Sequence, residues 1–67
     1  MKVEYDPEVD ILLITLKEEK PVHGEDAGEG IIIHFSEENE PLEIEILDAK
    51  EKLLDWLSAV LKARAKA

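Results

Sequence analysis

The chain lacks cysteine and glutamine, and each of Asn, Met, Trp, Tyr and Phe occurs once in its 67 residues. The absence of cysteine excludes disulfides and thiolate metal sites. A chain of this length buries only about 60% of the surface that its unfolded form exposes, so its stability depends on good local signals or on a partner subunit. The shortage of Gln, Asn and Met beside abundant Glu, Lys and Ile is typical of proteins from hot environments.

Long apolar runs are also missing. The longest, residues 11–14 and 31–33, are far shorter than the roughly 20 apolar residues that a membrane helix needs. Residues 1–6 carry acids where the apolar region of a signal peptide would stand. We therefore expect a soluble, cytoplasmic protein without a membrane partner.

Positive charge is scarce and unevenly placed. Seventeen acids stand against eight bases, which gives a net charge of -9. Residues 1–48 hold fifteen acids and three lysines, a net of -12, whereas residues 49–67 carry a net of +3. Nucleic-acid binding is excluded over most of such a surface, because it depends on neutralising phosphates. A charged partner is expected to be a basic protein.

Apolar periodicity predicts four strands. Residues 2–5 alternate apolar and polar side chains, and so do residues 42–46 of a strand expected over 42–47, as strands with one face in water do. Residues 11–16 and 31–35 are apolar on both faces. The stretch 17–30 contains all three glycines and is the least ordered by composition, although a brief edge strand near Val22 fits it.

A helix is predicted over about residues 49–64. Asp48 precedes it with Glu51 at the spacing of a capping box. Basic residues fall in its last turns, where cations complement the helix dipole. Its apolar stripe consists of Leu53, Leu57, Val60 and Leu61, with Leu54 and Trp56 at the margins.

These elements predict one α+β domain over residues 1–67: an antiparallel sheet of about four strands in a meander, with one C-terminal amphipathic helix packed on one face. One helix covers only one face, so either residues 12, 14 and 16 or residues 11 and 13 need another cover. The simplest cover is a second copy, and we expect a homodimer. The interface candidates are Leu12, Ile14, Leu16, Ile32 and Trp56.

Three segments together resemble a known prokaryotic family. They are Tyr5–Ile14, Gly30–Ile33 and Glu45–Ala49, and the resemblance to the domain-of-unknown-function family numbered 2283 covers roughly residues 1–49. The chain departs from the family pattern at Leu13, His34, Asn39 and Glu43, which affects a turn and a surface. The resemblance implies a compact α+β domain without assigned activity, so no catalytic residue is carried over. The resemblance also implies one specific alternative function, that of an antitoxin-like neutraliser of a small basic toxin.

A small metal-binding protein or enzyme is the competing hypothesis. It would use His23 and His34 with the loop acids Glu25, Asp26 and Glu29 as mixed ligands. These acids lack the alternating spacing of a calcium loop, and nothing in the sequence forces the two histidines together. The interpretation we favour is a loop histidine and a strand-surface histidine, with no metal or cofactor.

Asp6, Glu8 and Asp10 form a second candidate cluster, at every other position. General acid–base catalysis needs two carboxylates in contrasting environments, one of them desolvated. An open turn offers no such burial, so we expect Asp6 to bond the backbone of its own turn and Glu8 and Asp10 to be solvated. The sequence as a whole predicts an acidic, non-catalytic protein-interaction domain.

Overall fold

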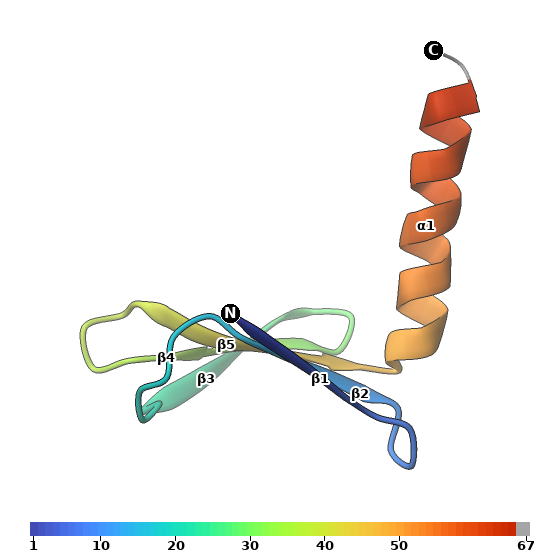
Figure 1. The fold of residues 1–67 in the computed structure, drawn as a ribbon. Coiled ribbons are helices and arrows are strands. Elements are labelled where there is room, and N and C mark those ends of the chain that lie inside the picture. The colour runs from blue at the N-terminus through green and yellow to red at the C-terminus, as the bar shows by residue number, and fades with distance from the viewer. Residues whose placement is uncertain (66–67) are drawn as a thin grey trace.

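The computed structural model describes residues 1–65, which form five strands and one helix. Figure 1 shows an open sheet with the helix rising from the end of a strand. Four strands and the helix begin and end within one residue of the expected ranges, and the fifth strand lies in the stretch for which only a brief edge strand was considered. The elements are β1 (Lys2–Asp6), β2 (Ile11–Thr15), β3 (His23–Gly28), β4 (Ile31–Phe35), β5 (Pro41–Leu47) and α1 (Ala49–Ala65).

The sheet has the order β1-β2-β5-β4-β3, and every neighbouring pair is antiparallel. Strands β3, β4 and β5 form a meander, and β1 and β2 form a hairpin. The two units join where β2 pairs with β5, far along the chain, with Leu12 opposite Ile46. The predicted α+β class with an antiparallel sheet is thus confirmed, with five strands in place of about four.

Strand register divides the side chains between two unlike faces. Directly paired residues point to the same side of a sheet, and successive residues alternate. One side, here called the apolar face, carries Val3, Tyr5, Leu12, Ile14, Ile31, Ile33, Phe35, Leu42, Ile44 and Ile46. The other, here called the carboxylate face, carries Glu4, Asp6, Ile11, Leu13, Asp26, Ile32, His34, Glu43 and Glu45.

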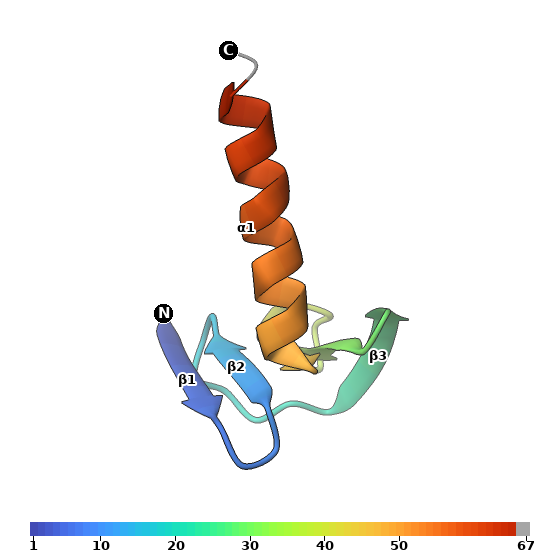
Figure 2. The same ribbon diagram turned by 90° about the vertical axis from the view of Figure 1, so that its right-hand side faces the viewer.

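The helix does not lie on the sheet, and the expectation that it packs on one face is wrong for the single chain. It rises steeply from the end of β5 on the apolar side, as the two views in Figures 1 and 2 show. Asp48 adopts a left-handed conformation with φ of 51°, which turns the chain out of the sheet. Beyond its first turns the helix projects into solvent, and Leu57 is 55% exposed.

Strand β3 was expected only as a brief edge strand because its sequence is unlike a strand. It contains two glycines and no β-branched residue, and all six of its residues are exposed. Pairing with β4 forms it, and a register shift between Asp26 and Gly28 marks a bulge where Oδ1 of Asp26 accepts the N–H of Gly28 at 2.7 Å. Strand β3 is therefore an edge strand held by its backbone ladder.

The buried apolar side chains of the described residues are few. Only Leu42, Ile46 and Ala49 are buried, together with the hydroxyl residue Ser36. Ser36 lies at the end of β4, where its Oγ accepts the N–H groups of Glu38 and Glu40 at 3.2 and 3.1 Å. Within residues 1–65, the helix is too short and too polar to cross a membrane.

Candidate functional groove on the carboxylate face

A groove of about 620 Å³ lies on the carboxylate face, toward the β1–β2 edge. Its position follows from the β1–β2 hairpin, whose Asp6–Asp10 turn closes one end. It is lined by Glu4, Tyr5, Asp6, Pro7, Val9, Ile11, Leu13, Glu43 and Glu45. The groove therefore has an apolar floor from β2 and carboxylates on both sides.

Strand register explains this arrangement. Leu13 of β2 pairs with Glu4 of β1 on one side and with Glu45 of β5 on the other. The clean alternation of β5 places Glu43 and Glu45 on the same face, two residues apart. An apolar floor between carboxylates suits an extended segment that carries both apolar and basic side chains.

His34 and Glu45 bridge β4 and β5 on this face. Nε2 of His34 lies 3.1 Å from Oε1 of Glu45, and each side chain is 27% exposed. Gly24 of β3 lies opposite His34, and a Cβ atom there would approach Nδ1 of the imidazole to 3.0 Å. The glycine therefore makes room for the ring beside the groove.

The two histidines of the metal hypothesis lie on opposite faces of the sheet. His23 stands on the apolar face, stacked on Phe35 with ring centroids 5.2 Å apart, and its Nε2 lies 3.6 Å from Glu25. His34 stands on the carboxylate face. The two imidazoles cannot bind one ion together, and no group of three or more potential ligands gathers within residues 1–65.

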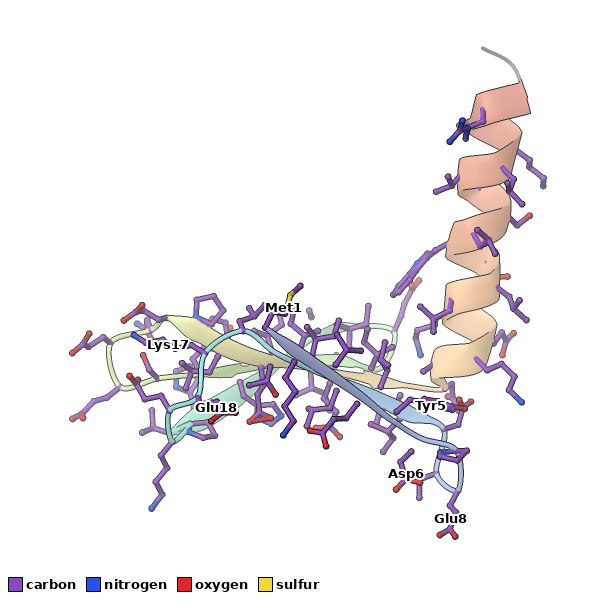
Figure 3. The ribbon with its side chains drawn as sticks, viewed as in Figure 1. Met1, Tyr5, Asp6, Glu8, Lys17 and Glu18 are labelled. Carbon is purple, nitrogen blue, oxygen red and sulfur yellow. The ribbon has the colours of Figure 1, made fainter. Side chains whose placement is uncertain are left out.

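The carboxylates of Asp6 and Asp10 in the second candidate cluster bind different parts of the chain. Oδ1 of Asp6 accepts the N–H of Glu8 at 3.0 Å, which confirms the predicted turn contact. Figure 3 shows Asp6 and Glu8 pointing away from the helix side of the sheet. Asp10 was expected to be solvated, and it is partly exposed, but its carboxylate also accepts hydrogen bonds at the base of the helix.

Asp10 joins the first hairpin to α1. Its Oδ1 accepts the Tyr5 hydroxyl at 2.8 Å and the N–H of Lys50 at 3.0 Å, and its carbonyl accepts the N–H of Ala49 at 3.0 Å. These bonds satisfy donors that a helix start leaves unpaired, so Asp10 performs the capping that the sequence assigned to Asp48. The Tyr5 hydrogen bond and then the Lys50 N–H lower the pKa of Asp10.

The hydrogen bond between Tyr5 and Asp10 shifts the pKa values of the two residues in opposite directions. The hydrogen bond to Asp10 raises the pKa of the Tyr5 phenol, since the anionic carboxylate stabilises the protonated hydroxyl. Sequence reasoning missed this group because Asp10 and Lys50 are forty residues apart. The one sequence signal is an Asp after a Tyr-Asp-Pro turn, and it does not identify the helix as the partner.

The five interface candidates do not form one surface. Leu12 and Ile14 point to the apolar face, and Leu16, which is 40% exposed, continues their alternation just beyond β2. Ile32 lies on the opposite, carboxylate face. Trp56 is on the helix and 45% exposed. Leu12 also lines a cleft of about 340 Å³ between the sheet and the helix base, together with Tyr5, Lys50, Leu53, Leu54 and Leu57.

An open antiparallel sheet with one C-terminal helix, and a shallow groove in place of a deep pocket, defines the class as a small α+β domain. The family model described as "Protein of unknown function (DUF2283)" matches residues 2–50. The chain therefore belongs to this family, and the match ends at the first turn of α1. No curated protein and no solved structure is similar enough to match the chain.

Proposed function

We propose that this protein is a non-catalytic, cytoplasmic interaction domain that forms a homodimer and binds a basic protein segment on its carboxylate face. The observation that carries the proposal is the pairing of Leu13 with Glu4 and Glu45, which places an apolar floor between carboxylates. The net charge of -12 over residues 1–48 extends the negative potential around this groove. Neutralisation of a small basic toxin is the specific form that the family resemblance implies.

A binding measurement with defined peptides tests the proposal. The probe is a fluorescent peptide of alternating lysine and leucine, and the control probe replaces lysine by glutamate. We expect the lysine peptide to bind and its affinity to fall as salt rises, because attraction between exposed charges is screened. Equal binding of the two peptides, or binding that salt leaves unchanged, would contradict the proposal.

A matched pair of variants locates the site. Glu43→Gln with Glu45→Gln removes two carboxylates from the groove, and Glu37→Gln with Glu38→Gln removes two from the turn after β4. Both pairs change the net charge equally. We expect the groove pair to weaken lysine-peptide binding at least several-fold more than the turn pair. Equal weakening would mean that the peptide senses net charge alone and that the groove is not the site.

A further inference from the structure

We infer that two copies of this chain associate about a two-fold axis, with the helix of each copy packed on the apolar face of the other copy's sheet. This inference rests on the homodimer of the proposed function and specifies its architecture. It does not involve the groove on the carboxylate face.

The apolar face is uncovered in the single chain. Of its ten large apolar residues only Leu42 and Ile46 are buried, while Val3 is 58% and Tyr5 is 43% exposed. The face runs across β1, β2, β5 and β4, since paired residues continue from Val3 through Ile14 and Ile44 to Ile33. An apolar surface that spans four strands marks an interaction site.

The helix carries a matching uncovered surface. At 100° per residue its large apolar side chains occupy an arc of roughly 160°. All of them are at least 40% exposed: Leu53, Leu54, Trp56, Leu57, Val60 and Leu61. An isolated helix of this length is marginal in water, so its apolar side needs a packing partner.

Size supports the same conclusion. The chain exposes 5247 Å², whereas a folded monomer of 7.6 kDa is expected to expose about 4,300 Å². Its radius of gyration is 14.0 Å, against about 11 Å for a compact domain of 67 residues. The excess surface is roughly 950 Å² per chain, or roughly 1,900 Å² for a pair, which is the size of a stable protein interface.

The base of the helix explains why a second chain, and not the same chain, provides the cover. Three contacts fix the direction in which α1 leaves the sheet: Ala49 N–H to the Asp10 carbonyl, Lys50 N–H to the Asp10 carboxylate, and the Lys52 ammonium to the Leu47 carbonyl. Folding the helix down onto its own sheet would break these bonds. Held upright, the helix presents its apolar arc to another molecule.

A second copy fits because the chain offers both halves of the contact. In a two-fold dimer, each contact that one copy makes with the other is also made in return. The chain has both an apolar helix and an apolar sheet face, so each helix can pack on the sheet of the other copy. The cleft of about 340 Å³ beside Leu12 and Leu54 can receive an apolar side chain of the second copy.

Sedimentation of the wild-type protein over a concentration series tests the association. We expect a mass of twice 7.6 kDa. A monomer at every concentration would overturn the inference, and the peptide-binding proposal could still stand, because its groove lies on the other face. If the protein is a dimer and does not bind the lysine peptide, the peptide-binding proposal is overturned and the inference about the dimer stands.

An isotope-filtered nuclear Overhauser experiment on a mixture of labelled and unlabelled wild-type chains tests the arrangement. We expect contacts between chains that join the methyl groups of Leu57 and Val60 to those of Ile33 and Ile44. The inference is overturned if these helix–sheet contacts occur only within one chain, or if the contacts between chains join only sheet to sheet.

Two variants with the same change in net charge provide the matched test. Leu57→Glu places a carboxylate within the apolar arc, and Lys62→Gln removes a charge from the opposite side of the helix. We expect Leu57→Glu to raise the dissociation constant of the dimer at least about a hundredfold, since burying an unpaired charge is costly, and Lys62→Gln to leave it within about threefold. Equal effects of the two variants would overturn the inference.

Discussion

The Tyr5 hydroxyl donates a hydrogen bond to Oδ1 of Asp10 at 2.8 Å, and the same oxygen accepts the N–H of Lys50 at 3.0 Å. One carboxylate thereby ties the first hairpin to the start of the helix. It also fixes the direction of the helix, because the Asp10 carbonyl accepts the N–H of Ala49. Asp10 therefore makes two of the three contacts that fix the direction of the helix, and the third joins Lys52 to the Leu47 carbonyl.

Asp10→Ala is expected to lower the melting temperature by several degrees. The substitution leaves the Tyr5 hydroxyl and the Lys50 N–H without their acceptor, and loss of a helix cap is destabilising. Glu8→Ala is the matched control, because it removes an exposed carboxylate from the same turn. Thermal unfolding followed by circular dichroism measures both. Equal shifts would show that Asp10 does not hold the helix base.

The pKa of Asp10 predicts a pH dependence with a definite sign. The hydrogen bonds from Tyr5 and Lys50 lower its pKa in the folded protein from the usual 3.8. A lowered pKa means that the unfolded chain binds the proton first as pH falls. The contribution of Asp10 to stability is thus complete above about pH 3.8 and is lost as pH falls through the lowered value.

The comparison that checks this sign is wild type against Asp10→Asn, which keeps the shape without the charge. We expect the wild type to be the more stable at about pH 7 and the difference to shrink as pH falls below about 3.8. A difference that grows on acidification would contradict the assignment. The raised pKa of Tyr5 affects stability at alkaline pH. The contribution of Tyr5 to the free energy of unfolding is lost as pH rises above about 10.0.

Leu42→Ala is expected to destabilise the protein by about 2–5 kcal/mol, because Leu42 is fully buried and its removal leaves a cavity. Val22→Ala is the matched control, since Val22 is 59% exposed and the cost is expected to lie within about 0.5 kcal/mol. Denaturant unfolding at fixed protein concentration measures both. A small effect at Leu42 would show that the first residues of β5 do not form part of the core.

The sequence predicted those parts of the fold that depend on side-chain periodicity. Alternation at residues 42–46 placed Glu43 and Glu45 on one face, as the strand register shows. The double-sided apolar strands also indicated that one helix could not cover the sheet. Each of these features is local, so neighbouring residues carry the signal.

The features that sequence reasoning missed depend on distant partners. Strand β3 is held by its ladder to β4 and has no apolar alternation of its own. The cap from Asp10 to Lys50 spans forty residues, and nothing near Asp48 indicates that the helix leaves the sheet. The groove required the pairing of β2 with β5, which an uninterrupted meander does not contain.

The turn between β3 and β4 offers a stabilising substitution. Glu29 and Gly30 have φ of 55° and 78°, the two positive values of the hairpin turn for which Asn-Gly is the preferred pair. Glutamate is strained there, whereas asparagine tolerates the left-handed region. We therefore expect Glu29→Asn to raise the free energy of unfolding by about 0.5–1 kcal/mol.

Glu29→Gln is the control for this substitution, because it removes the same charge without asparagine's tolerance for positive φ. Relief of charge repulsion in a chain of net charge -9 would stabilise both variants equally. Relief of backbone strain would stabilise only Glu29→Asn. Denaturant unfolding of the two variants therefore separates the causes, and equal stability would mean that the left-handed geometry of Glu29 costs the fold nothing measurable.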